Sequence, residues 1–113
     1  SLLLRFSGTV TTKTGNQFHY THIRTFTETG GIGVTLTEGQ ICYLNGNCDA
    51  KGEINYVISK NDNLVQTERE FSTIETSDKF TLKYWGVEED GSTPVYVEQN
   101  LCVLENIFAE NCE

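Results

Sequence analysis

The stretch ICYLNGNCDAKGEINYVI, residues 41–58, decides the fold that we predict for this chain of 113 residues. Two cysteines, Cys42 and Cys48, bracket a run of turn-forming residues. Asn45-Gly46 is the strongest hairpin signal in the chain, because both residues tolerate the positive φ that a type I′ turn requires. The apolar side chains that follow alternate with polar ones, as in a half-buried strand: Ile54, Tyr56 and Ile58.

Short alternating segments of the same kind recur along the chain at spacings of about ten residues. The expected strands are 2–12, 17–28, 32–37, 40–44, 53–59, 64–71, 79–86 and 94–103. Residues 104–112 fit a final strand or a short helical turn equally well. This pattern predicts an all-β antiparallel β-sandwich of about eight strands, with a small closed β-barrel as the alternative. We expect residues 1–113 to form a single disulfide-stabilised β domain.

Three local departures from the alternation predict irregular strands. Gly8 interrupts the first strand and predicts a bulge there. Ile23 lies on the opposite parity from Tyr20 and Phe26, which predicts a bulge or kink within 21–24. Charged residues alternate poorly along 64–71, as expected of a strand at the edge of a sheet.

Two short motifs also resemble those of a known family. Ser7-Gly8-Thr9-Val10 followed by Thr14-Gly15-Asn16, and then DAKGEI at 49–54, resemble the Gly-x-Val and Asp-x-x-Gly-x-Phe pattern of prealbumin-like β-sandwich modules. The resemblance covers only these segments, and they are residues that β-turns select in any case. It implies a sandwich and no particular function.

Acidic residues outnumber basic ones, 16 against 8, which gives a net charge of -8. Such a surface repels phosphate backbones and anionic lipid, so we expect no nucleic-acid partner and no polybasic docking on membranes. No stretch approaches the ~20 apolar residues of a membrane-spanning helix, so no membrane span is expected. The opening SLLLRF is too short for the core of a signal peptide, and we expect the chain to be a mature or trimmed product.

Four cysteines, an even number in a small domain, predict two disulfides and a secreted or extracellular protein. Local pairing would give Cys42–Cys48 and Cys102–Cys112, whereas crossed pairing would fasten the last strand to the central hairpin. We favour the local pairing. In a two-residue turn Cys42 would face Asp49, so the first local bridge requires a diagonal or a wider loop.

The sequence predicts no metal, no cofactor and no catalytic residues. His19 and His22 lie three apart on a strand and project from opposite faces, so they do not converge on one ion. Oxygen ligands gather at 61–63 and 88–90, as calcium requires, but Asn and Asp are also turn residues, and we interpret both segments as turns. No Gly-x-Ser-x-Gly elbow occurs, and the carboxylate pairs lie in loops, an edge strand and the tail, so we predict that the protein is not an enzyme.

Two aromatic residues are the predicted ligand-binding residues. By parity, Trp85 lies on the face opposite Phe80, Leu82 and Tyr84, and Tyr96 lies opposite its own strand's apolar face. If the two strands are neighbours, Trp85 and Tyr96 form an exposed platform for a sugar or an anchor for a protein partner. The alternative is that both faces are buried and Trp85 belongs to the core.

These observations together predict a secreted, non-enzymatic protein-recognition module that presents loops and one exposed face on a rigid β scaffold. A host-directed effector or toxin and an adhesion or receptor-type ectodomain fit equally well. The alternative is a carbohydrate- or small-ligand-binding sandwich that uses the exposed aromatics. A small hydrolase is the third choice.

Overall fold

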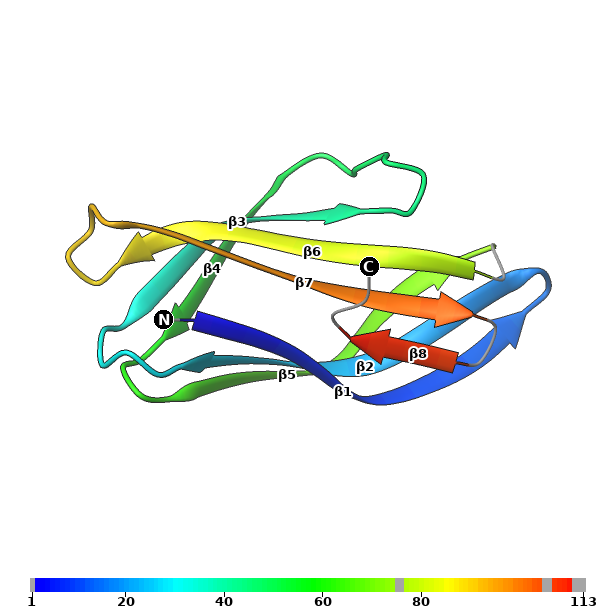
Figure 1. The fold of residues 1–113 in the computed structure, drawn as a ribbon, viewed down its shortest axis with the longest axis horizontal. Helices are drawn as coiled ribbons and strands as arrows, with labels where there is room; N and C mark the ends of the chain where they lie inside the picture. Colours follow the sequence, from blue (N-terminus) through cyan, green and yellow to red (C-terminus); the bar gives the residue numbers. More distant parts are fainter. Residues whose placement is uncertain (1, 75–76, 105–106, 111–113) are drawn as a thin grey trace.

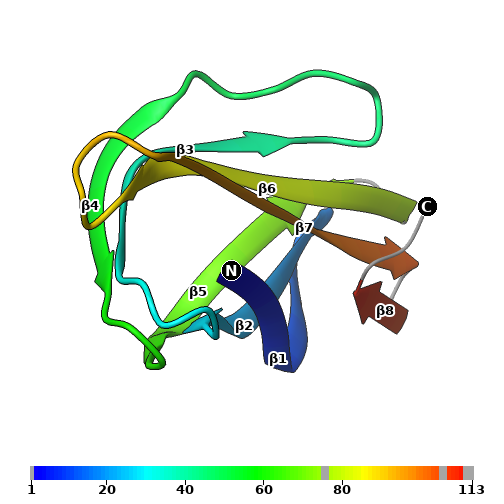
Figure 2. The ribbon, with the colours of Figure 1, turned by 60° about the vertical axis from the view of Figure 1, so that its left-hand side comes forward.

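The computed structural model describes residues 2–74, 77–104 and 107–110, which form two antiparallel sheets packed face to face (Figure 1). One sheet has the strand order β1-β2-β5 and the other the order β4-β3-β6-β7-β8. The strands are β1 (Leu2–Thr14), β2 (Gln17–Glu28), β3 (Val34–Cys42), β4 (Gly52–Ile58), β5 (Asn63–Thr73), β6 (Ser77–Glu88), β7 (Pro94–Leu104) and β8 (Ile107–Glu110). The predicted β-sandwich is confirmed, and the alternative of a closed barrel is wrong, because the strands divide into two separate sheets (Figure 2).

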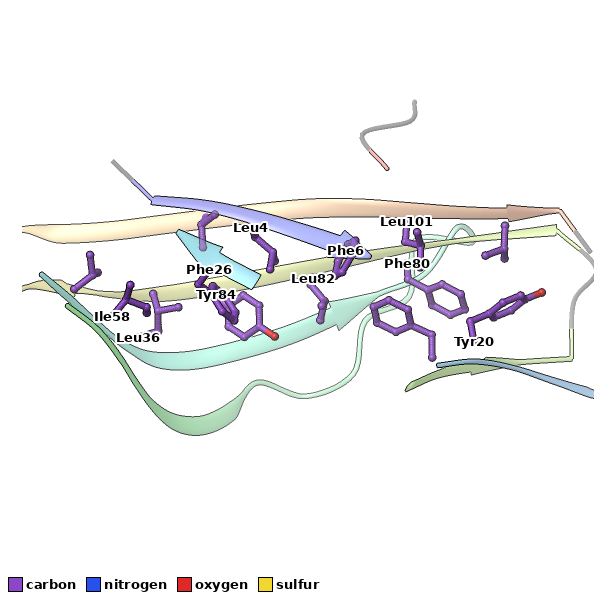
Figure 3. Packing of buried hydrophobic residues seen from close by; sticks show 14 residues of the cluster. Leu4, Phe6, Tyr20, Phe26, Leu36, Ile58, Phe80, Leu82, Tyr84 and Leu101 are labelled. Atoms are coloured by element: carbon purple, nitrogen blue, oxygen red, sulfur yellow. The ribbon is translucent and has the colours of Figure 1, made fainter. Parts of the chain in front are cut away.

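Apolar side chains at alternate strand positions fill the space between the sheets, as Figure 3 shows. Aromatic rings run through this core: Phe71 stacks on Phe80 with ring centroids 4.5 Å apart, and Phe26 meets the Tyr84 ring edge-on at 5.1 Å. The largest fully buried apolar side chains come from both sheets: Leu4, Tyr20, Phe26, Leu36, Ile58, Phe80, Leu82 and Leu101. The inward parity of β2 and β6 is thereby fixed, and every alternate residue on these strands faces outward.

The bulge predicted at Gly8 is confirmed in β1, whereas the irregularity predicted within 21–24 has its extra residue on the neighbouring strand β5. The β1–β2 register shifts beside Gly8, which has a φ of 59°. The β2–β5 register shifts between His22 and Arg24, opposite Glu68 with its φ of 56°. β2 itself alternates regularly, because His22 and Arg24 take the inward positions and Ile23 points out. β5 lies at an edge of its sheet, as predicted.

The predicted division of residues 32–44 into two strands is wrong. The segments 32–37 and 40–44 were expected to be two strands, but Val34–Cys42 is a single strand, β3. Glu38 follows a register shift against both neighbouring strands instead of forming a turn. The extra residue reverses the parity of β3, so that Gly39 faces inward beside the Tyr84 ring. A Cβ on Gly39 would lie 3.0 Å from Tyr84 Cε1, so glycine leaves room for that ring.

The turn at Asn45-Gly46 is also not the predicted two-residue type I′ turn. Gly46 alone has a positive φ, of 89°. Its N–H donates to the Tyr43 carbonyl at 3.0 Å, while the Tyr43 N–H donates to the Asn47 carbonyl at 2.8 Å. These bonds define a three-residue loop with a glycine bulge. The longer loop shifts the register by one residue and sets Cys42 directly opposite Cys48.

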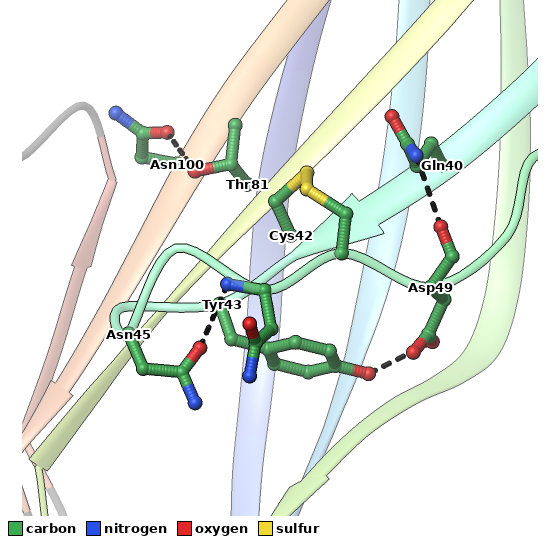
Figure 4. Close-up of a disulfide and its surroundings, with 9 residues drawn as sticks. Gln40, Cys42, Tyr43, Asn45, Asp49, Thr81 and Asn100 are labelled. Carbon is green, nitrogen blue, oxygen red and sulfur yellow. Dashed lines mark hydrogen bonds between the residues drawn. A yellow bond between two sulfur atoms is a disulfide. The ribbon is translucent and has the colours of Figure 1, made fainter.

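The Cys42–Cys48 disulfide therefore needs no diagonal contact across the hairpin (Figure 4). Hydrogen bonds flank the pair on both sides, and the two Cα atoms are 4.0 Å apart. Opposed residues that do not exchange backbone hydrogen bonds approach most closely in antiparallel strands, which suits a disulfide. The predicted local pairing is confirmed for this bridge. Cys102 is disulfide-bonded as well, and Cys112 lies outside the described residues.

Removing the Cys42–Cys48 bridge is expected to lower the free energy of unfolding by about 2 kcal/mol, the loop-entropy value for so short a ring. The sequence separation of the two cysteines is 6, so the bridge restricts only a small part of the unfolded chain. Urea unfolding of the double variant Cys42→Ala/Cys48→Ala measures the loss. A double variant as stable as the native chain would contradict the expectation.

Candidate recognition surface

Trp85 and Tyr96 face each other across β6 and β7, with ring centroids 5.4 Å apart and the planes tilted by 47°. Their sequence neighbours Tyr84 and Val97 are buried in the core. Because side chains alternate along a strand, both aromatic residues point to the outer face of the five-stranded sheet. Tyr96 is 48% exposed and Trp85 is partly exposed. The two strands are therefore neighbours, and the alternative that Trp85 belongs to the core is wrong.

Apolar side chains extend this pair along the same face of the sheet. Val87 pairs with Pro94 in the next outward-facing row, and Val57 lies in that row across Thr35. Val57 is 59% exposed. We call the five apolar side chains the outer patch: Val57, Trp85, Val87, Pro94 and Tyr96. Thr35 lies between Val57 and Val87, and Trp85 and Val87 are partly exposed. Exposed and partly exposed apolar residues gathered on one face are typical of interaction sites.

Charged side chains border the outer patch. Glu38 pairs with Trp85 on one side and with Glu53 on the other. The Lys51 Nζ atom lies 4.1 Å from the centroid of a Trp85 ring, a cation–π contact that covers part of the indole. Burial and the nearby Glu98 carboxylate raise the pKa of Tyr96. An apolar centre with a charged rim is the usual arrangement of a protein-binding surface.

A buried polar pair, His22 and Arg24, lies between the sheets, and the sequence did not predict it. His22 is 1% exposed and Arg24 is 8% exposed, although both lie on a core strand. Arg24 Nε donates to His22 Nε2 at 2.9 Å, and Arg24 Nη1 donates to the Tyr84 hydroxyl at 3.3 Å. The guanidinium carbon also lies 4.9 Å from the Phe71 ring centroid. Parity alone would have found this pair, since both residues share the inward face of Tyr20.

The other histidine lies on the opposite face of β2, as predicted. His19 Nδ1 is 3.0 Å from the Ser72 hydroxyl and 3.3 Å from a Glu70 oxygen on the neighbouring strand. His22 points into the core, where it stacks on Phe71 at 4.5 Å. The two imidazoles therefore do not converge.

The loops considered as calcium sites use their oxygen atoms within the chain. Asp90 accepts hydrogen bonds from the Thr93 hydroxyl and from the Ser92 and Thr93 amides, which hold the pKa of its carboxyl at about 2. Asp62 Oδ1 accepts the Asn63 N–H at 2.8 Å, and Asn63 Oδ1 accepts the Thr27 hydroxyl at 2.7 Å. In the described parts of the chain, no three His, Cys, Asp or Glu side chains gather so as to hold a metal ion.

Glu28 ties two loops together at one end of the sandwich. Its carboxylate accepts the backbone N–H groups of Gly30, Gly31 and Ile32, in addition to that of Asn61. The Asn61 hydrogen bond, against the opposing effect of burial and with help from Gly30 and Ile32, lowers the pKa of Glu28 to about 2. One carboxylate therefore links the segment 30–32 to the turn at Asn61.

Comparison with known proteins defines the class of fold and goes no further. No family model matches the sequence, and no curated protein matches it. In fold the chain is similar to a solved structure, the X-ray structure of the Northeast Structural Genomics Consortium target SoR45. The TM-score is 0.73 at 14% sequence identity, over 92% of this chain and 86% of that chain. Within the described residues, no helix is long and apolar enough to cross a membrane.

Proposed function

We propose that the protein is a secreted, non-enzymatic protein-recognition module that binds its partner with the outer patch. The observation that carries this proposal is the outward-facing Trp85–Tyr96 pair at the centre of that patch, in which Tyr96 is exposed and Trp85 partly exposed. Tryptophan and tyrosine supply large contact areas at little cost in side-chain entropy and are enriched among the residues that dominate binding energy. The disulfide at Cys42–Cys48 supports an oxidising compartment and hence secretion.

The partner is proposed to be a protein with basic residues around an apolar centre. A net charge of -8 attracts such a surface over a distance and repels acidic ones. Glu38 and Glu53 lie in the same row as Trp85, where they meet the rim of the partner. Binding should therefore weaken as salt is added and should survive chelation of calcium.

The proposal is tested with partners captured on the native chain by cross-linking and then purified. Trp85→Ala is expected to weaken binding of the true partner by about tenfold or more, measured as Kd by biolayer interferometry. Val65→Ala is the matched control, because Val65 is 55% exposed on the other sheet. The proposal fails if no captured protein loses affinity for Trp85→Ala, or if Val65→Ala has the same effect.

Binding of a carbohydrate is the second candidate, because an exposed aromatic pair also suits a sugar ring. Lys51 lies over the Trp85 ring and would have to move aside for a sugar to stack there. We therefore place this candidate second. Titration of Trp85 fluorescence with a broad panel of oligosaccharides decides it: quenching that Tyr96→Ala abolishes would support sugar binding, and a flat response would exclude it.

A further inference from the structure

A small cavity of about 230 Å³ opens between the sheets, on the inner side of β3, β4 and β6. Apolar and aromatic side chains line it, and its polar groups are those of Arg24, Gln40 and Asp49 and the hydroxyls of Tyr56 and Tyr84. The residues that line it include Arg24, Asp49, Ile54, Tyr56, Leu82 and Tyr84. The cavity lies on the other face of β6 from the outer patch, because Tyr84 and Trp85 are adjacent residues.

Arg24 carries its charge into this cavity without a carboxylate partner. It is 8% exposed, and its two hydrogen bonds go to neutral groups, His22 and the Tyr84 hydroxyl. In the part of the chain that the structure describes, no salt bridge joins it to an acid, and the cationic Arg69 lies nearby. The acidic residue that lines the cavity, Asp49, accepts a hydrogen bond from Tyr43 at 2.8 Å. A buried charge without a counter-ion is costly in any protein.

The surroundings of Arg24 include further buried polar atoms that lack partners. Arg69 Nε and Gln66 Oε1 have no hydrogen bond within the described residues, although both atoms are buried. Arg69 pairs with His22 and Gln66 pairs with Arg24 across β2 and β5. Buried Arg24 and partly buried Arg69 therefore share one region of an otherwise acidic protein. Such a region favours an anion over a cation or a neutral molecule.

We propose that this cavity binds a small organic carboxylate. The carboxyl group pairs with the guanidinium of Arg24 and accepts the Tyr84 hydroxyl, and the apolar body lies against Ile54, Tyr56 and Leu82. Arginine is suited to this role because its planar group offers two parallel N–H donors to a carboxylate. The cavity has room for roughly eight water-sized groups at about 30 Å³ each, which suits a ligand of about the size of benzoate.

The test uses benzoate as the probe and benzamide as its neutral counterpart of equal shape. Binding to the native chain is measured by titration calorimetry and by shifts of the Arg24 Nε–Hε NMR signal. Benzoate should bind about tenfold to a hundredfold more tightly than benzamide, as expected for hydrogen bonds to a charged group. Arg24→Met should weaken benzoate binding by a similar factor. Lys60→Met removes an equal charge from an exposed site and should leave the affinity unchanged.

Tyr84→Phe is a second cavity variant, in case Arg24→Met does not fold. It removes one hydroxyl that contacts the ligand and keeps the ring. It should weaken benzoate binding while leaving the Arg24 signal in place. The proposal is wrong if the native chain does not bind benzoate, if benzamide binds as tightly, or if both cavity variants bind like the native chain. This result is independent of the proposed protein partner, which binds the opposite face of the sheet.

Discussion

Replacing Gly86 by alanine is expected to lower the free energy of unfolding by about 3 kcal/mol, the upper range for overpacking a well-packed site. A Cβ on Gly86 would lie 2.0 Å from the Thr35 carbonyl oxygen and 2.7 Å from Leu36 Cα. Both are backbone atoms of β3, which pairs with β6 beside its bulge at this point. No change of rotamer relieves such a contact, so the two strands must separate.

Gly52→Ala is the matched control for this expectation. Gly52 lies in the same sheet, but a Cβ there would have nothing within 4 Å. It should change stability by less than about 0.5 kcal/mol. Urea unfolding followed by the fluorescence of Trp85 measures both variants. A Gly86→Ala chain with the stability of Gly52→Ala would show that β3 and β6 are not as close as described.

The sequence predicted the outward position of Trp85 and Tyr96 because only the period of two matters for that question. Tyr84 and Val97 are apolar neighbours that fix the inward parity of β6 and β7, whatever the strand order. For the two aromatic side chains to meet, β6 and β7 must also be neighbours. The short loop between Glu88 and Pro94 joins these strands as a hairpin. The outward position of both residues follows from local rules, which is why it could be predicted before the fold was known.

The hairpin at residue 45 could not be settled in this way. An Asn-Gly pair fits a two-residue turn, with both φ values positive, and equally a three-residue loop in which the glycine alone is positive. The choice decides whether Cys42 faces Asp49 or Cys48, and the disulfide forms only in the second register. The turn residues leave the register of the hairpin undecided, and the disulfide selects the register in which Cys42 faces Cys48.

The buried pair His22 and Arg24 was not predicted from the sequence, for a different reason. Apolar alternation is the signal for an inward face, and His22 and Arg24 interrupt it at two successive inward positions of β2. The sequence therefore suggested an irregular β2, whereas the strand is regular and its interior is polar. Neither residue has a neighbour in sequence that explains its burial. Their partners, Tyr84 and Phe71, are brought in from β6 and β5 by the sandwich.

The chain is expected to lose about 3 kcal/mol of stability through His22 as the pH falls from 7 to 4, from 1.36 kcal/mol for each unit of pKa difference. Burial, opposed by a hydrogen bond to the Tyr20 carbonyl and helped by Arg24 and Arg69, lowers the pKa of His22 to about 4 from an ordinary 6.5. The unfolded chain therefore takes up this proton first. Stability falls between pH 6.5 and about 4, and below that the folded chain is protonated too.

The hydrogen bonds of His22 give this expectation a geometric basis. Arginine only donates, so His22 Nε2 must accept from Arg24 Nε, and Nδ1 must carry the proton that goes to the Tyr20 carbonyl. A proton added at Nε2 would point at the Arg24 N–H, with Arg69 as a second nearby cation. The side chain is 1% exposed, so water cannot replace the lost bond. Protonation must therefore break the contact with Arg24.

Comparison of the native chain with His22→Phe isolates this contribution from that of the carboxylates. Phenylalanine keeps a ring against Phe6 and Phe71 but does not titrate. The free energy of unfolding is measured in urea for both chains. From pH 7 to pH 4 the native chain should lose about 3 kcal/mol more of it than His22→Phe does. The His22 nitrogen shifts in NMR should meanwhile report the Nδ1-protonated tautomer until about pH 4. A flat difference, together with a His22 that is protonated near pH 6.5, would mean that Arg24 Nε does not donate to this ring.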